Sequence, residues 1–356
     1  MTLDSLLPNL GEWLRGTGAE SDVVVSTRIR LARNLAGVPF ATRATNAQKS
    51  EIEARSRDAI LNAGLPGNIQ YLSVNGLPAL DRQFLVERQL ISRELSSVLE
   101  GPRGVAFDDR ESTSVMINEE DHLRLQVMRS GLSLDEAWAQ INTVDDALEH
   151  KLSYAFHDQF GYLTACPTNV GTGMRASVML HLPALGITKE IEKLFRSLQK
   201  INLVVRGLYG EGSRASGDLY QISNQVTLGK SEEKILQEIR EVIDLILNYE
   251  RRARTALMKE QKQAQQDRVA RAIGTLGSAT MITSEETMEL LSTVRLGIQL
   301  HLLEDLPATT VNQLFIHTQA AHLQKIMGAP LDGEERNAAR ARYLRNRLRE
   351  LGANPR

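Results

Sequence analysis

Apolar residues recur at every second position in several short runs between residues 22 and 230. This period is typical of a strand with one buried face, because successive side chains of a strand point to opposite faces. It predicts strands that begin near Val23 and near Leu123. Two more predicted strands have their inward positions at Ala176, Val178, Leu180 and Leu182, and at Tyr220, Ile222, Asn224, Val226 and Leu228.

Helical periods lie between and after these runs. Ser133 and Glu136 have the spacing of a capping box and precede apolar residues at helical spacing as far as Leu152. A second apolar stripe predicts a helix over 232–249, and Thr283 with Glu286 predicts the start of another. After residue 249 no strand pattern occurs, so the C-terminal part is expected to be all helical.

These patterns predict an α+β fold with a boundary near residue 255. Residues 1–21 form an N-terminal segment, residues 22–254 a mixed domain of strands and helices, and residues 255–356 a helical domain. A chain of 356 residues is long enough for two domains.

Composition narrows the class of protein. With 42% hydrophobic residues, 24% charged residues and a formal net charge of −2, the chain has no overall attraction for nucleic acid or acidic membranes. Its one cysteine, Cys166, excludes an internal disulfide framework and fits a reducing compartment. The sequence contains no signal-peptide pattern and no apolar run long enough to cross a bilayer. We therefore expect a cytoplasmic protein that binds neither nucleic acid nor membrane.

Several familiar motifs are absent or incomplete. The stretch 228–231 resembles the end of a P-loop, but Asn224 stands where that motif requires its first glycine. The apolar alternation there favours a strand that runs straight into a helix. His317 and His322 are five residues apart, off a common helical face, and are interpreted as structural or solvated. No cluster with metal-ligand spacing occurs, and the motifs of ordinary protein kinases are missing.

Five segments carry unusual combinations of charged, cysteine and glycine residues. Each one alone has an ordinary explanation, such as a solvated strand-end arginine, a polar turn or a core cysteine. Their joint occurrence is the informative signal. The segments are 26–34 with Arg28 and Arg30, 87–92, 118–124 with three consecutive acids, 166–178 with Cys166 and Arg175, and 206–212 with Arg206 and Glu211.

In wording and order these segments closely resemble the signature blocks of the phosphagen (guanidino) kinase family, over roughly residues 22–250. The stretches 118–124 (Asn-Glu-Glu-Asp-His-Leu-Arg) and 166–172 (Cys-Pro-Thr-Asn-Val-Gly-Thr) are the most specific. The resemblance implies a catalytic domain with a large antiparallel sheet flanked by helices, followed here by the all-α C-terminal domain.

The resemblance implies that Glu120 and Glu211 hold the guanidinium of the acceptor, with Glu120 as the base, and that Cys166 lies against it as a thiolate. The chemistry agrees, because a guanidinium is protonated in water and must lose a proton as it attacks phosphorus.

For ATP, the resemblance implies a cluster of arginines that neutralises the triphosphate. Magnesium would be held mainly by phosphates and water, without a dedicated metal motif. The implied ATP-binding positions are Ser26, Thr27, Arg28, Ile29, Arg30, Arg124, Arg175, Ala176, Ser177, Val178, Met179, Arg206, Gly207, Leu208, Tyr209 and Gly210.

Within the family, the layout resembles that of the bacterial protein-arginine kinases. The first arginine block begins at residue 26, which leaves no room for the N-terminal helical domain of the small-molecule kinases, and a helical extension of about a hundred residues follows the catalytic domain. This resemblance implies protein substrates with exposed arginines, marking of proteins for a Clp-type protease, heat-shock repressors as clients, an activator protein, a role in the stress response and a homodimer.

Two positions depart from the family pattern. A phosphoarginine pocket with the pattern Arg-Asp-x-x-Arg-Ala corresponds here to Arg336, Asn337, Arg340 and Ala341, so an amide replaces the acid. A solvated basic helix face is the alternative for this segment. Gln89 stands where relatives commonly have histidine near the nucleotide.

Two other functions stay open. The chain could phosphorylate free arginine or another small guanidino compound, or it could be a non-catalytic phosphoarginine-binding regulator on a kinase scaffold. The complete set of acids and arginines argues against the last of these.

Overall fold

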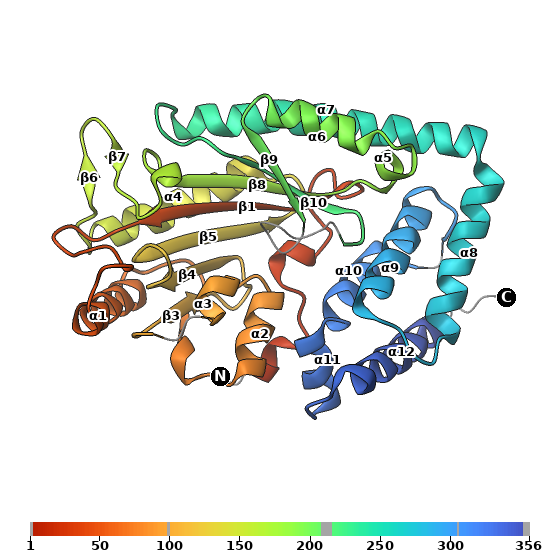
Figure 1. The fold of residues 1–356 in the computed structure, drawn as a ribbon, viewed down its shortest axis with the longest axis horizontal. Coiled ribbons are helices and arrows are strands. Elements are labelled where there is room, and N and C mark those ends of the chain that lie inside the picture. Colours follow the sequence, from red (N-terminus) through yellow and green to blue (C-terminus); the bar gives the residue numbers. More distant parts are fainter. Residues whose placement is uncertain (1–2, 98–99, 208–215, 305, 352–356) are drawn as a thin grey trace.

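The structure is a computed structural model that describes residues 3–97, 100–207, 216–304 and 306–351. Within these ranges the chain forms one large sheet, helices on both of its faces, and a group of helices that contains the C-terminus of the described chain (Figure 1). None of the helices in these ranges is long and apolar enough to cross a membrane.

The sheet has eight strands and every neighbouring pair is antiparallel. A separate two-stranded hairpin consists of β6 (Phe156–His157) and β7 (Gly161–Tyr162). In spatial order the large sheet contains β2 (Gln70–Ser73), β3 (Gly104–Phe107), β4 (Thr113–Ile117), β5 (Leu123–Ser130), β1 (Val24–Arg33), β8 (Met174–His181), β10 (Leu219–Asn224) and β9 (Leu203–Gly207).

The helices form two groups in the sequence, and the first group ends with the long helix α7. Short 3₁₀ helices at Leu3–Leu6, Glu12–Leu14, Val74–Gly76 and Pro167–Asn169 complete the description. The first group of α-helices contains α1 (Asn46–Asn62), α2 (Ala79–Glu87), α3 (Arg93–Ser97), α4 (Leu134–Glu149), α5 (Pro183–Ile187), α6 (Ile191–Gln199) and α7 (Glu232–Glu260). Those that follow are α8 (Lys262–Ser278), α9 (Ser284–Gln299), α10 (Ala308–His317), α11 (Ala320–Met327) and α12 (Gly333–Glu350).

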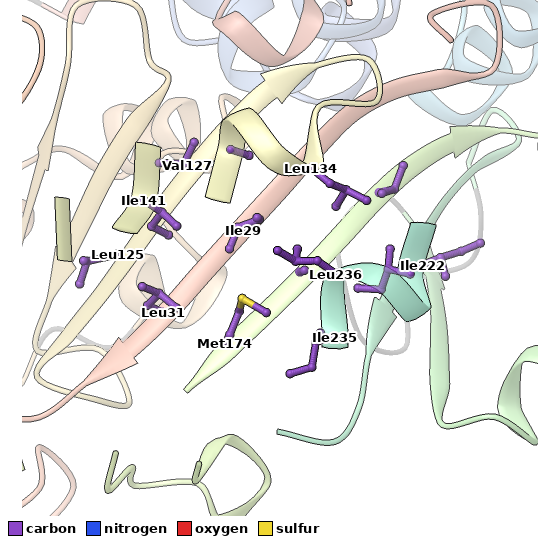
Figure 2. Packing of buried hydrophobic residues seen from close by; sticks show 14 of the residues in the cluster. Ile29, Leu31, Leu125, Val127, Leu134, Ile141, Met174, Ile222, Ile235 and Leu236 are labelled. Atoms are coloured by element: carbon purple, nitrogen blue, oxygen red, sulfur yellow. The ribbon is translucent and has the colours of Figure 1, made fainter. Parts of the chain in front are cut away.

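The larger hydrophobic core lies between one face of the sheet and the helices α1, α4 and α7. Figure 2 shows its centre, where side chains of the central strands meet side chains of α4 and α7. Each of these residues is almost fully shielded from solvent, so the alternation in the sequence marks this face correctly. The labelled residues are Ile29, Leu31, Leu125, Val127, Met174 and Ile222 from the sheet, with Leu134, Ile141, Ile235 and Leu236 from the helices.

Two apolar clusters lie on the opposite face of the sheet. At one side Val25, Met128 and Met179 pack against Trp13 and the C-terminal helices. At the other, Phe107 and Met116 belong to a cluster with α2. Between these two apolar clusters the same face carries the polar side chains described below.

The predicted α+β architecture, with its antiparallel sheet and its helical C-terminal part, is confirmed. Two local predictions need correction. β10 ends at Asn224, and Val226 and Leu228 are exposed in a loop before α7, because no neighbouring strand pairs with them. Ser133 precedes α4 but does not cap it, because its hydroxyl donates to the carbonyl of Ser130.

The predicted boundary at residues 254 and 255 stays a prediction. It lies within α7, which continues without a break to Glu260 and then leads into α8. Figure 1 shows α7 running alongside the strands of the sheet and α8 passing from its end to the C-terminal helices. Arg254, on the last part of α7, is buried beside Glu250 and Asp22, so this part of the helix still belongs to the packing of the sheet domain.

Candidate active site

Arginine side chains from four strands lie on the face of the sheet opposite the large core. Arg28 and Arg30 are two residues apart on β1, with the core residue Ile29 between them, so both point to this face. Arg30 is the direct partner of Arg175 on β8, and Ala32 is the partner of Arg124 on β5. Partners across a pair of strands share a face, so the register gathers these arginines on one surface.

The arginines line a cavity of about 620 Å³. A volume of this size accommodates a ligand as large as a nucleotide. Arginines outnumber acids in its lining, which makes the cavity strongly positive. The charged lining residues are Arg28, Arg30, Arg93, Arg103, Arg124, Arg175 and Arg206, with Glu94, Glu119 and Glu120.

The cluster is electrostatically costly in the absence of a ligand. Burial, followed by the nearby charges of Arg124, Arg175 and Arg206, lowers the pKa of Arg28 to about 10. Burial, then the neighbouring arginines, also lower the pKa of Arg30 well below its usual range. The Nε atoms of Arg28 and Arg30 are buried and meet no hydrogen-bond acceptor among the described residues. An anion that brings oxygen acceptors into the cavity would relieve both penalties.

The acids of segment 118–124 lie at the edge of this cluster. Arg124 forms an ion pair of 2.6 Å with the buried Glu119 and a longer one of 3.4 Å with Glu120. The Glu120 side chain is 42% exposed, so it can reach a molecule that enters from solvent. Burial raises the pKa of Glu120, as do the charges of Asp121 and Glu119, and Arg124 opposes this rise. A raised pKa suits a carboxylate that accepts a proton.

A buried carboxylate ties the cysteine loop to the acid segment. Asp121 Oδ1 accepts hydrogen bonds from the backbone N–H of Ala165 at 2.7 Å and from Asn34 Nδ2 at 2.6 Å. The residues next to this contact are Glu120 and Cys166, so the loop brings the cysteine toward the acid. Cys166 is partly exposed, and its Sγ lies 3.0 Å from Thr168 Oγ1. Cys166 is not among the described residues that line the arginine cavity.

Gln89 holds one of the cluster arginines. Its Oε1 accepts a hydrogen bond from Arg28 Nη1 at 3.1 Å, and its backbone carbonyl accepts one from Gln126 Nε2 at 2.7 Å. Gln89 has a φ of 62°, a left-handed conformation that is uncommon for a residue other than glycine. The residue that departs from the family pattern therefore contacts the arginine cluster directly.

Not every predicted ATP-binding position presents its side chain to the cavity. Ser26, Ser177 and Met179 line a small space next to it. Gly207 ends β9 opposite Tyr220. Leu208, Tyr209, Gly210 and Glu211 lie outside the described residues. The side chains of Thr27, Ile29, Ala176 and Val178 are fully buried on the other face, where they build the fold.

The cavity also contains side chains that the sequence analysis did not assign to the site. Ser92, Arg93, Arg103, Glu119 and Gln126 line it. Ser92 and Glu119 belong to segments already singled out, 87–92 and 118–124. Gln126 lies outside them, but the alternation that places Arg124 on this face also places Gln126 there. Ser92 donates a short hydrogen bond to Glu119 Oε1. Arg103 has no local signal, because only the pairing of β3 and β4 brings it near Glu119.

The C-terminal segment with Arg336 and Arg340 lies on α12, away from this cavity. Arg340 is only 2% exposed, and it donates to the carbonyls of Thr318 and Ile282 and to Asn337 Oδ1. Arg336 donates to the carbonyl of Leu331, and Ala341 is buried in the helical core. Arg340 therefore does not lie on a solvated basic face, and much of its bonding capacity is used inside the protein.

His317 and His322, interpreted as structural or solvated, are both buried at the ends of two different helices. Lys230 in the rejected P-loop stretch forms an ion pair with Glu238 at the start of α7. In the part of the chain that the structure describes, no group of three or more His, Cys, Asp or Glu side chains could hold a metal ion.

Two models of known protein families match this chain. A family model for the ATP:guanido phosphotransferase C-terminal catalytic domain matches residues 51–253, which leaves Arg28 and Arg30 outside the matched range. A second, for the protein-arginine kinase McsB C-terminal domain, matches residues 262–356.

Two similar curated proteins and one solved structure agree with these matches. The protein-arginine kinase of Halothermothrix orenii is 46% identical over 98% of this chain and 99% of its own length. That of Symbiobacterium thermophilum is also 46% identical, over 94% and 96%. The duplicated taurocyamine kinase of Schistosoma mansoni, solved with transition state analog components, is 28% identical over 69% of this chain with a TM-score of 0.60. This chain spans 35% of that protein.

Proposed function

The chain belongs to the ATP:guanido phosphotransferase family, and from this membership we propose that it transfers the γ-phosphoryl group of ATP to arginine side chains of proteins. The observation that supports this most is the convergence of Arg28, Arg30, Arg124, Arg175 and Arg206 in one cavity beside the acids Glu119 and Glu120.

The cavity suits the phosphate side of the reaction. Phosphoryl transfer needs positive charge that is in place before the transition state forms, because the transferred group carries negative charge on its oxygens. Here the sheet holds the guanidinium groups together, and the buried Nε atoms of Arg28 and Arg30 have no acceptor among the described residues. Magnesium would be held by phosphates and water, and it would supply further neutralisation of the phosphate oxygens.

The acid segment suits the acceptor side. In the proposed step a guanidinium nitrogen attacks the γ-phosphorus, the bond to the bridging oxygen of ADP breaks, and a P–N bond forms. The proton lost by the nitrogen passes to Glu120, whose raised pKa favours its acceptance. Glu211 is the second proposed carboxylate and Cys166 the group that polarises the guanidinium. Glu119, which is buried and paired with Arg124, holds that arginine in place.

The choice of a protein acceptor rests on the curated relatives and on the C-terminal match. Both relatives are named protein-arginine kinases and are similar over nearly the whole chain. The match of residues 262–356 to the C-terminal domain of a protein-arginine kinase supports the same choice. A kinase of a small guanidino compound is the alternative, because one of the similar solved structures is a taurocyamine kinase.

The wider role stays a prediction from the family resemblance. It includes marking of proteins for Clp-type proteolysis, repressor clients, an activator protein, a part in stress response and protein quality control, a cytoplasmic location and a homodimer. A phosphoarginine pocket at Arg336, Asn337, Arg340 and Ala341, and a role of residues 255–356 in substrate binding and dimerisation, are further proposals of the same kind.

Incubation of the protein with Mg-ATP and an unfolded model protein tests the proposal. We expect acid-labile phosphate on arginine, identified by mass spectrometry. Parallel incubation with free arginine and with taurocyamine separates the alternatives, because phosphorylation of a small compound in preference to the protein would contradict the proposed substrate. Nucleotide binding without transfer to any acceptor would favour the non-catalytic regulator.

A further inference from the structure

The end of α2 is held by the C-terminal helices through one buried carboxylate. Glu87 is 4% exposed, and its Oε1 accepts a hydrogen bond from the backbone N–H of Ala321 at 2.8 Å. Its Oε2 accepts from the N–H of His322 at 3.0 Å and from His322 Nδ1 at 2.8 Å. Ala321 and His322 are in the first turn of α11, where backbone N–H groups have no partner within the helix. A residue of the sheet domain therefore accepts hydrogen bonds from the N–H groups at the start of a C-terminal helix.

The next residue, Arg88, completes the same connection. It forms a two-bonded ion pair with the buried Glu111 and donates to the carbonyl of Asn9 at 2.9 Å. Its Nη1 also lies 3.3 Å from His322 Nε2. An arginine can only donate, so Nε2 of His322 must accept, and the proton of the ring is on Nδ1, where it donates to Glu87. Burial lowers the pKa of His322, which favours this neutral form.

The third consecutive residue reaches the arginine cavity. Gln89 follows directly, turns the chain in its left-handed conformation and accepts a hydrogen bond from Arg28 Nη1 at 3.1 Å. That conformation costs free energy for a residue with a side chain, so its neighbours must hold it. Arg88 and Gln89 also bond through their N–H groups to carbonyls of α2. Three successive residues thus connect the start of α11 with an arginine of the cavity.

We propose that Glu87 is a positioning residue, through which the C-terminal helices keep Gln89 against Arg28 and so hold the cavity in its nucleotide-binding form. The inference rests on the proposed function, because it takes Arg28 to bind the nucleotide. A shift of α11 relative to α2 would then change nucleotide affinity without any direct contact between the C-terminal helices and ATP.

A purely structural role for Glu87 is the competing explanation, and the two differ in what they predict. If Glu87 only joins the two parts of the protein, its loss lowers stability and leaves nucleotide affinity unchanged. If it positions Gln89, its loss weakens nucleotide binding beyond any effect on stability. Tyr343→Phe is a matched control, because it removes a 2.7 Å contact with His317 in the same helical region and does not touch Glu87 or Gln89.

The test measures the dissociation constant of Mg-ATP by calorimetry for Glu87→Gln, Gln89→Ala, the double variant and Tyr343→Phe, with the unfolding midpoint of each. We expect Glu87→Gln and Gln89→Ala each to weaken Mg-ATP binding about three- to tenfold, as the loss of one hydrogen bond would. The double variant should bind no more weakly than Gln89→Ala alone, because both act through one contact. Tyr343→Phe should keep the wild-type affinity.

Unchanged Mg-ATP affinity in Glu87→Gln, or additive losses in the double variant, would overturn the inference. If Glu87→Gln does not fold, His322→Phe provides a weaker form of the same comparison. It retains a ring next to Phe84 and removes the side-chain bonds to Glu87 and Arg88, whereas the backbone N–H bonds to Glu87 remain. Binding is read directly, so a wild-type protein that binds Mg-ATP but phosphorylates no arginine would contradict the proposed function and leave this inference standing.

Discussion

Arg30 on β1 and Arg175 on β8 are direct partners in the antiparallel register of the sheet. Like charges in directly opposite positions destabilise a pair of strands. The pKa of Arg30 reflects this, because after burial the charges of Arg28, Arg124 and Arg175 lower it. The fold therefore contains a cluster that opposes its own stability and that a polyanion would neutralise.

This relationship predicts a trade between stability and activity. Arg30→Gln should raise the free energy of unfolding of the ligand-free protein by about 0.5–1 kcal/mol, because one of the opposed charges is removed. The same change should lower turnover at saturating ATP by roughly a hundredfold, because the cluster acts most strongly as charge develops in the transition state. Urea unfolding and steady-state kinetics measure the two effects. A loss of ATP affinity with unchanged turnover would mean that Arg30 only binds the ground state.

Glu120 gives a prediction about pH. A base must be ionised, and burial raises the pKa of Glu120 above the ordinary glutamate value. In the profile of kcat/KM against pH, the acidic limb should therefore have its midpoint above the ordinary glutamate pKa of about 4.3. Glu120→Gln should abolish phosphoryl transfer and leave Mg-ATP affinity close to that of the wild type. Glu51→Gln, on the exposed part of α1, serves as the control. Turnover like that of the wild type in Glu120→Gln would remove this residue from the reaction.

Substitution and alkylation of Cys166 test whether its thiol takes part in the reaction. Its side chain is partly exposed beside Thr168, on the loop tied to Asp121. We expect Cys166→Ser to retain reduced activity, because the hydroxyl keeps a polar atom but does not form an anion at neutral pH. In the wild type, Mg-ADP with an arginine peptide should slow alkylation by iodoacetamide, followed by mass spectrometry. Full activity of Cys166→Ser would show that the thiol has no part in catalysis.

His317 predicts how stability changes in acid. Burial, with the charge of Arg88 acting in the same direction, lowers its pKa to about 4. Below the ordinary value of about 6.5 the unfolded chain binds a proton that the folded protein does not, so stability falls with pH until about pH 4. The wild type should lose about 2–3 kcal/mol more than His317→Gln between pH 7 and pH 4. Urea midpoints measured across this range give the difference, and parallel curves for the two proteins would contradict it.

The two arginines of α12 should respond differently to substitution. Arg340 donates to two buried carbonyls, so Arg340→Ala should cost about 2–4 kcal/mol of stability. Arg336, which is partly exposed and donates to one carbonyl, should cost less than about 1 kcal/mol. Weak binding of free phosphoarginine, with the active site blocked by a nucleotide analogue, should be lost in Arg336→Ala. Binding that survives in this variant would exclude the segment as the phosphoarginine site.

The local features of this protein could be predicted from its sequence. Alternation places Ile29 and Leu31 on the buried face and Arg28 and Arg30 on the other, because side chains of a strand point to alternate faces whatever pairs with it. The wording of segments 118–124 and 166–172 identified the family before any contact was known. The predictions of a strand as far as Leu228 and of a helix cap at Ser133 were wrong, because strand pairing and competing hydrogen bonds decide such details.

Contacts between distant segments were decided only by the tertiary structure. Three contacts join residues that no sequence pattern relates. Arg30 pairs with Arg175, Arg103 lies near Glu119, and Glu87 accepts hydrogen bonds from the start of α11. The burial of Arg340 is of the same kind, because it depends on the carbonyls of two other segments. Periodicity and motifs reflect interactions that each strand or helix makes by itself, whereas strand register and burial result from the packing of the whole chain.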